Sequence, residues 1–135
     1  MTRRGTPEAD LQRAVVGALR FALPKGAILH HCANEVTQPG LRGATRQAIL
    51  VGMGVHRGFA DLMVLSGGRV LFLELKSPTG RLSPEQAAFR DAVQAQGFGW
   101  ALVRSLDDAL GALADHGFTT RVVNPDARPA RRSLP

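Results

Sequence analysis

FADLMVLSGGRVLFLELK, at residues 59–76, is the stretch of sequence that decides the fold. Its two apolar, β-prone runs flank Gly67-Gly68, and a Gly-Gly pair between such runs predicts a β-hairpin. Because successive side chains of a strand alternate between its two faces, Glu74 and Lys76 are expected on the same side. Asp61, at the start of the first strand, is expected to face that pair across the hairpin.

This spacing predicts two carboxylates and an ammonium group that converge at one edge of an apolar sheet. Carboxylate oxygens are hard ligands that suit Mg²⁺ or Mn²⁺, so Asp61 and Glu74 are candidate metal ligands of a phosphodiesterase. The alternative is a solvated ion pair on an exposed strand. The apolar residues at 70–73 argue against that alternative, because they make both faces of the strand apolar. Charged side chains on a buried face of a strand need oppositely charged partners or a metal ion.

Length and composition bound the class of protein. With 135 residues, 44% of them apolar and 21% charged, the chain has the composition of one globular domain. No apolar run approaches the roughly 18 residues of a transmembrane helix. The basic N-terminus is followed by no apolar segment, so we expect no secretory signal. The lone Cys32 has no partner for an internal disulfide, which favours a reducing compartment.

The charge and residue usage indicate a partner and a setting. A net charge of +6 favours a polyanionic partner. The alternative is genomic, because proteins of GC-rich bacteria use Arg freely, and the chain is rich in Ala, Arg and Gly and lacks Tyr. We expect a cytoplasmic protein of a bacterial cell or a phage-infected host.

The order of predicted elements is α-β-α-β-β-α-β-α, an α/β fold with a mixed sheet flanked by helices. Helices are expected after the N-cap residues Thr6, Ser83 and Ser105, and the first two of these helices have Pro at their first position. In the helix after Ser83, we expect an inward face of Ala88, Phe89, Ala92, Val93 and Ala95. The remaining elements are a strand at 27–33, a helix at 44–53, the hairpin at 59–75 and a strand at 100–103. We expect one domain at 1–118 and a flexible basic tail, rich in Pro and Arg, at 119–135.

Several short motifs occur in a fixed order along the chain. They are Glu8-x-x-x-Gln12, Asn34-Glu35, the run 52–62 that ends in Ala60-Asp61-Leu62, Glu74-Leu75-Lys76-Ser77-Pro78 and Leu82-Ser83-Pro84-Glu85-Gln86. Together they resemble the PD-(D/E)xK nuclease superfamily, and within it the stand-alone VRR-NUC proteins of phages and bacteria. The resemblance runs from about residue 7 to residue 114. One departure is Ala60, where the family has Pro. That residue shapes the backbone and ligates nothing, so the site is expected to survive the change.

The resemblance implies a restriction-endonuclease-like core and a Mg²⁺- or Mn²⁺-dependent endonuclease that acts on DNA. It further implies branched or four-way junction DNA as substrate, and a homodimer similar to Holliday-junction resolvases. Ile49-Leu50-Val51 is candidate interface material, because apolar residues continue round that helix. The alternative is that this helix is buried on two sides within one chain.

Roles for the acidic and amide residues follow from the motif and the chemistry. Lys76 is expected to orient or deprotonate the attacking water, and the Leu75 carbonyl is a further candidate metal ligand. Glu8 matches the family's helical acid and would complete the metal shell, unless it only caps the helix dipole. Gln12 would hold a metal-bound water, unless it is merely solvated. Gln86 matches the family's last motif and would contact phosphate or support Lys76, with an ordinary surface Gln as the alternative.

A second set of residues is expected around the cleft. Asn34 and Glu35 would line it, unless they form only a turn. Four arginines in loops or in a helix near the site are candidate contacts to phosphates: Arg42, Arg46, Arg57 and Arg81. For each of them, the alternative is an ordinary solvated surface charge. The histidines His30, His31 and His56 lack the spacing of a structural zinc site.

Two other functions compete with a structure-selective nuclease. One is a non-catalytic nucleic-acid-binding module on a nuclease fold, which would have no reason to keep an acidic pair against phosphates. The other is a nuclease with a fixed recognition sequence, for which the chain has little room.

Overall fold

The computed structural model describes residues 6–32 and 43–121, with side chains left out of the description for residues 43–47. The helices in this part of the chain are α1 (Pro7–Ala22), α2 (Gly43–Gly52), α3 (Pro84–Ala95) and α4 (Leu106–Asp115). The strands are β1 (Ile28–His31), β2 (Leu62–Ser66), β3 (Arg69–Leu75) and β4 (Gly99–Val103). The element order is the one that the sequence predicts.

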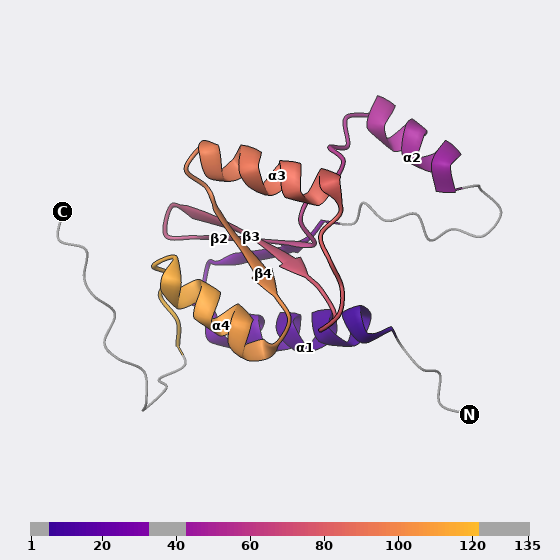
Figure 1. Cartoon of the computed structure of the whole chain (residues 1–135). Coiled ribbons are helices and arrows are strands. Elements are labelled where there is room, and N and C mark those ends of the chain that lie inside the picture. The colour runs from indigo at the N-terminus through magenta and orange to yellow at the C-terminus, as the bar shows by residue number, and fades with distance from the viewer. Residues whose placement is uncertain (1–5, 33–42, 122–135) are drawn as a thin grey trace.

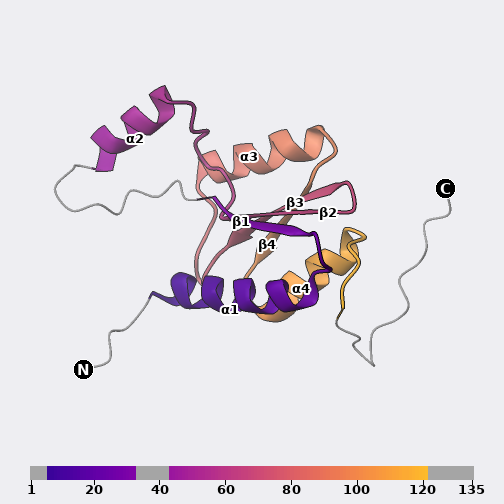
Figure 2. The ribbon, with the colours of Figure 1, turned by 180° about the vertical axis from the view of Figure 1, so that it is seen from behind.

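The sheet is mixed, with the strand order β1-β2-β3-β4. The pairs β1–β2 and β2–β3 are antiparallel, and β3–β4 is parallel. Helices α1 and α4 cover one face of this sheet and α3 covers the other (Figures 1 and 2). The predicted fold class, a mixed sheet flanked by helices, is confirmed.

The hairpin turn sets the register that brings the acidic residues together. Gly67 and Gly68 both have positive φ, +59° and +76°, as a two-residue turn that matches the twist of the strands requires. Leu62 pairs with Leu73. Extending that antiparallel register by one residue places Asp61 opposite Glu74.

Strand β3 is buried on both faces, as its apolar sequence predicts. Leu71, Leu73 and Leu75 belong to the larger core cluster, which also takes buried side chains from α1 and α4. Phe72 points the other way, into a smaller cluster with Phe89 of α3. Since side chains alternate along a strand, Glu74 lies on the face of Phe72, under α3.

The sequence predicts more buried residues on α3 than the structure shows. Only Phe89 and Val93 are buried in this helix, while Ala88, Ala92 and Ala95 are exposed. Phe89 and Val93 are four residues apart, so one narrow stripe meets the sheet. The three alanines need no burial because alanine is a good helix former on any face.

Helix α2 stands away from the sheet and packs closely against no other described element (Figures 1 and 2). Ile49 is 53% exposed, Val51 39% and Met53 79%. Burial of this helix on two sides within one chain is therefore wrong for the described residues. The apolar side chains of α2 find no cover in this part of the chain.

The last described residues remain attached to the domain. Phe118 is buried in the larger core, and the backbone N–H of Arg121 donates to the Ala22 carbonyl at the end of α1, at 2.6 Å. None of the described helices is long and apolar enough to cross a membrane.

Candidate active site

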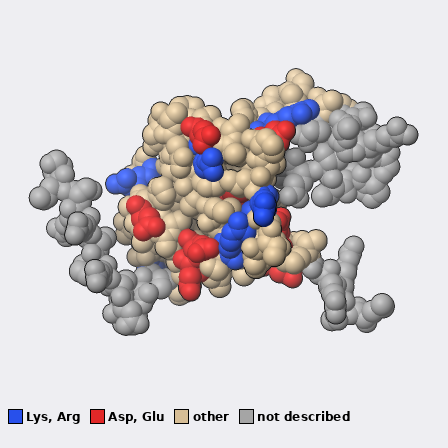
Figure 3. Space-filling model, viewed as in Figure 1, with Lys and Arg blue, Asp and Glu red and all other residues tan. Residues whose placement is uncertain are grey.

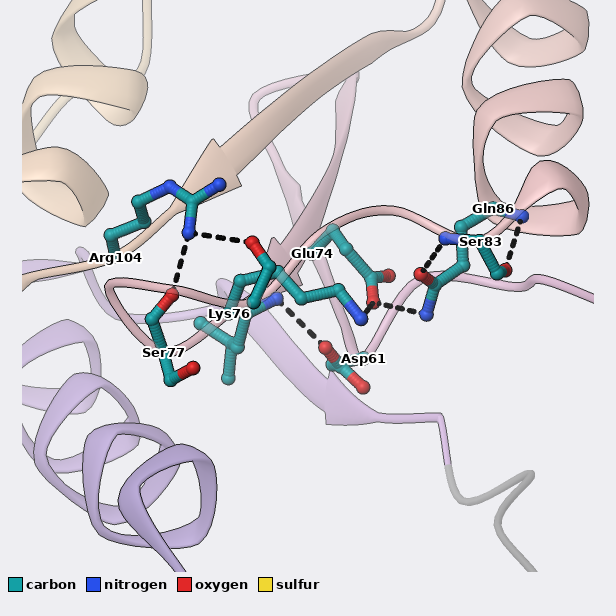
Figure 4. Close-up of polar contacts among 9 residues, drawn as sticks. Asp61, Glu74, Lys76, Ser77, Ser83, Gln86 and Arg104 are labelled. Carbon is teal, nitrogen blue, oxygen red and sulfur yellow. Dashed lines mark hydrogen bonds and ion pairs between the residues drawn. The ribbon is translucent and has the colours of Figure 1, made fainter.

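Asp61 and Glu74 meet at the edge of the sheet where β2 begins and β3 ends (Figure 4). Asp61 is held by the backbone of the neighbouring strand, because the Leu75 N–H donates to its Oδ2 at 2.7 Å. On the other side, the Asp61 carbonyl accepts from the N–H of Cys32, at the end of β1, at 2.8 Å. Strand β3 thus fixes one carboxylate oxygen of Asp61, and the residue after β1 fixes its backbone carbonyl.

Glu74 is almost fully buried, with 1% of its surface exposed. Its Oε1 accepts a hydrogen bond from Gln86 Nε2 at 2.8 Å and lies 3.9 Å from Lys76 Nζ. Its Oε2 is the one buried side-chain polar atom of the described residues that has no hydrogen-bond partner. A buried carboxylate oxygen without a donor is costly unless a proton or a cation satisfies it.

Both carboxyl groups resist ionisation in the protein alone. Burial, followed by repulsion from Asp61, raises the pKa of Glu74 from an ordinary 4.5 to about 8. Burial also raises the pKa of Asp61, although the Leu75 hydrogen bond and the charge of Lys76 act against this. Two carboxyls this close titrate as a pair, and a bound divalent cation would favour the ionised form of both.

The residues present fit a small, hard divalent cation. They offer carboxylate oxygens, one of them buried and unsatisfied, beside a single positive side chain. The described residues contain no group of three or more His, Cys, Asp and Glu side chains that could hold a metal ion. Mg²⁺ is commonly held by one or two carboxylates together with waters and substrate phosphates, and Asp61 and Glu74 supply a pair of carboxyl groups.

Gln86 joins the start of α3 to the acidic pair. Its Oε1 accepts from the Ser83 N–H at 2.9 Å, and the Ser83 Oγ accepts from the Gln86 N–H at 3.1 Å, which together form a capping box. The other end of the Gln86 side-chain amide, Nε2, donates to Glu74. Gln86 therefore supports Glu74 rather than Lys76. The incoming loop fits closely here, since a Cβ at Gly58, with φ +77°, would overlap the Glu85 carbonyl.

Arg104 was not predicted as a site residue, yet it holds the loop that follows Lys76 (Figure 4). Its Nη1 donates to the carbonyls of Ser77, Pro78 and Gly80, at 2.5, 3.3 and 2.8 Å. The signal in the sequence is its place directly after the strand at 100–103. A strand parallel to β3 ends at the same edge of the sheet, so its next residue lies beside the site.

The cleft in front of Asp61 is an open hollow of about 520 Å³. The cleft, as we use the word from here on, is the hollow lined by Glu8, Gln12, His31, Asp61, Leu75 and Ser77, among others. Glu8 and Gln12 therefore lie on the cleft as predicted, on the side formed by α1. His31 and Ser77 also lie on it, and the sequence gave no reason to select either. Glu74, Lys76 and Gln86 do not line the cleft, and Glu74 is buried.

The remaining predicted residues either have no described side chain or do not line the cleft. Asn34, Glu35 and Arg42 lie outside the described residues, and Arg46 belongs to α2 at a position whose side chain is not described. Arg57 and Arg81 are exposed, and neither lines the cleft. Lys and Arg are interspersed with Asp and Glu over the face seen in Figure 3, rather than gathered on it.

The arrangement resembles proteins of known structure. A structure described as "VRR_NUC domain protein" superposes with a TM-score of 0.63 at 19% sequence identity, over 84% of this chain and 90% of its own. A second, described as "VRR_NUC domain", superposes with a TM-score of 0.54 at 19% identity, over 84% of this chain and 100% of its own. No family model and no curated protein matches the sequence. This chain has the fold of VRR_NUC domain proteins.

Proposed function

We propose that this chain is a member of the VRR-NUC family and hydrolyses phosphodiester bonds of DNA with Mg²⁺ or Mn²⁺. The shared fold supports the family, and the motifs around Asp61, Glu74 and Lys76 support the activity. Fold alone would leave the chemistry open, because one fold serves many functions. The proposal therefore depends on the acidic pair.

One observation carries the proposal: Glu74 Oε2 is buried without a donor beside a second carboxyl group. A binding module for DNA would gain nothing from such a pair, which repels phosphates once it is ionised and costs folding free energy as it ionises. A divalent cation removes both costs.

Each side chain then has a defined role. Asp61 and Glu74 would hold the cation, with the Leu75 carbonyl as a further candidate ligand. When bound, a cation of this kind stabilises charge on a phosphate and makes a water more acidic. Lys76 lies 3.9 Å from Glu74 Oε1 and would orient the attacking water and balance charge on the phosphorane. Gln86 keeps Glu74 in place through its 2.8 Å hydrogen bond.

Glu8 and Gln12 would act from the far side of the cleft. Glu8 does not form a three-carboxylate group with Asp61 and Glu74, so we assign it to a water-mediated part of the metal shell. Gln12, four residues later on α1, would hold a water of that shell.

DNA with branches or four-way junctions is the proposed substrate. The net charge of +6 suits a polyanion, and the cleft is open rather than an enclosed nucleotide pocket. Part of the positive charge lies outside the described residues, at Arg3, Arg4, Arg42, Arg128, Arg131 and Arg132. A charge distribution of this kind favours contacts with the backbone over contacts that read base sequence.

A homodimer completes the proposal. Two symmetric cuts in a junction need two active sites, and a two-fold dimer supplies them through one interface. The exposed Ile49, Val51 and Met53 of α2 support a second copy as the partner, because α2 has no cover among the described elements.

A cleavage assay tests the function. The full chain would be mixed with labelled four-way junction, flap, single-stranded and duplex DNA in Mg²⁺, Mn²⁺, Ca²⁺ or chelator. We expect cleavage with Mg²⁺ or Mn²⁺, with preference for branched DNA, and binding without turnover in Ca²⁺, whose looser geometry aligns the water poorly. Full activity after exhaustive chelation would refute the metal-dependent mechanism. Binding without cleavage under every condition would favour the non-catalytic module.

A further inference from the structure

A second hollow lies at the other end of α1 from the cleft. It measures about 460 Å³ and is lined by Arg20, Lys25 and Arg121 together with uncharged residues of the α1–β1 connection and of β1. We call it the cationic hollow. It gathers cations from three places in the sequence: the last turn of α1, the loop that follows it, and the end of the described chain.

These three cations are not used elsewhere in the described structure. No Asp or Glu lines the cationic hollow. The ion pairs found among the described residues involve Arg13, Lys76 and Arg90 instead. Three like charges round one concavity repel one another, so their approach is stabilised when an anion lies between them.

The position of the hollow relative to the cleft suggests which anion. Glu8 lines the cleft and Arg20 lines the cationic hollow, twelve residues apart on one helix. At about 1.5 Å per residue, the two sites are separated by roughly 18 Å along α1. Phosphates of B-DNA rise about 3.4 Å per base pair along the axis, so this separation matches roughly five base pairs. Five base pairs are about half a turn of B-DNA, so the backbone that faces the same side there belongs to the complementary strand.

We propose that the cationic hollow binds the phosphate backbone of a DNA arm about five base pairs from the bond that is cut. This inference rests on the proposed nuclease function and extends it to a second contact on the same substrate. Arg20, Lys25 and Arg121 neutralise one or two phosphates there, without reading the base sequence. The contact fixes the direction in which the arm leaves the cleft.

A structural explanation of the same cations makes a different prediction. Arg20 lies in the last turn of α1, where a positive charge complements the helix dipole. If that were its only role, Arg20→Gln would lower the melting temperature and leave DNA affinity unchanged. The two explanations are separable because one acts on folding and the other on binding.

The test measures DNA affinity of the full chain in Ca²⁺ over a range of salt concentrations. It compares wild type, Arg20→Gln, Arg20→Gln/Lys25→Gln and the control Arg90→Gln. Arg90 lies on α3, on the opposite face of the sheet, and removing it changes the net charge by the same amount as removing Arg20. We expect the slope of log affinity against log salt to fall by about 1 for each charge removed from the hollow, and to stay near the wild-type value in Arg90→Gln.

A modified DNA locates the contact. Methylphosphonates, which are uncharged, would replace phosphates of both strands about four to six base pairs from the cut site. Wild type should lose affinity for this DNA, and Arg20→Gln/Lys25→Gln should show no further loss. An equal loss in both proteins, or a wild-type salt slope in the double variant, would overturn the site while leaving the nuclease proposal standing. Failure of wild type to bind any DNA would overturn both.

Discussion

At the scale of single residues, the site is organised around one buried oxygen. Glu74 Oε1 has Gln86 and Lys76 as neighbours, whereas Oε2 has no donor among the described residues. The asymmetry leaves one oxygen free to bind a cation and uses the other to fix the side chain. Two predictions follow from this, one on Gln86 and one on pH.

Gln86→Ala should reduce cleavage at saturating DNA roughly tenfold or more, because Glu74 loses the hydrogen bond that orients it. The same change removes half of the capping box and should cost about 1 kcal/mol of unfolding free energy. Ser83→Ala is the matched control, since it removes the Ser83 Oγ bond of the cap and leaves the Gln86–Glu74 bond in place. Equal activity losses in the two variants would mean that Gln86 acts only through the stability of α3.

The stability of the metal-free protein should fall as the pH rises from about 4.5 to about 8. Folding raises the pKa of Glu74 from 4.5 to about 8, so the folded state holds a proton that the unfolded state loses over this interval. The raised pKa of Asp61 acts in the same direction. We expect the melting temperature in chelator to fall by roughly 5 °C or more. The decline should be smaller in Mn²⁺ and in Glu74→Gln, and a melting temperature that rises with pH over this interval would contradict it.

At the scale of elements, the loop after β3 connects three parts of the site. Arg104, directly after β4, binds three carbonyls of residues 77–80. The same loop brings Gly80 against the Lys76 stem and the Glu8 carboxylate, each 3.3 Å from where a Cβ of residue 80 would lie. The loop thus holds the cleft wall between α1 and the end of β3.

Arg104→Ala should lower the rate at saturating DNA roughly tenfold and destabilise the fold by about 2 kcal/mol, because it leaves carbonyls without their charged donor. Arg104→Lys should recover part of the rate, since an ammonium also presents several hydrogens on one nitrogen. A change in KM alone, with the saturated rate intact in both variants, would indicate a DNA contact rather than positioning of the loop.

The elements follow from the sequence more fully than the contacts between them do. The hairpin, the capped helices and the pairing of Asp61 with Glu74 depend on local signals: two glycines, two Ser-Pro or Thr-Pro starts and a strand period of two. Arg104 and Cys32 reach the site because β4 and β1 end at its edge of the sheet, which depends on strand order. The sequence left two readings of the helix at 44–53 open, an interface with a second copy or burial within one chain, because an apolar helix sequence does not say which surface covers it.

At the scale of the whole molecule, apolar surface and charge lie apart from the cleft. Helix α2, whose Ile49, Val51 and Met53 are exposed, stands at one corner of the domain (Figure 1). The cationic hollow is lined in part by Arg20 and Leu23, at the C-terminal end of α1. The proposed junction nuclease would need both a partner copy and contacts along the DNA arms, and the two surfaces that we propose for them are separate.

Light scattering at micromolar concentration should give twice the 14.4 kDa mass of the chain. Ile49→Glu should shift the protein to monomer, since a charge buried at a helix interface needs a partner. Leu106→Glu is the control, because Leu106 is 40% exposed on α4, away from α2. A wild-type monomer that still makes paired cuts in a junction would refute the dimer.

The most direct test of the central claim is the single-turnover rate of junction cleavage in Mn²⁺ by wild type and Glu74→Gln. Glutamine has nearly the shape of Glu74 but lacks its charge, so the cation loses a ligand while the buried strand keeps its packing. We predict a rate at least about a hundredfold lower, with junction binding in Ca²⁺ equal to or tighter than wild type, because repulsion of phosphate is also removed. A Glu74→Gln rate within about tenfold of wild type would show that Asp61 and Glu74 are not the centre of catalysis.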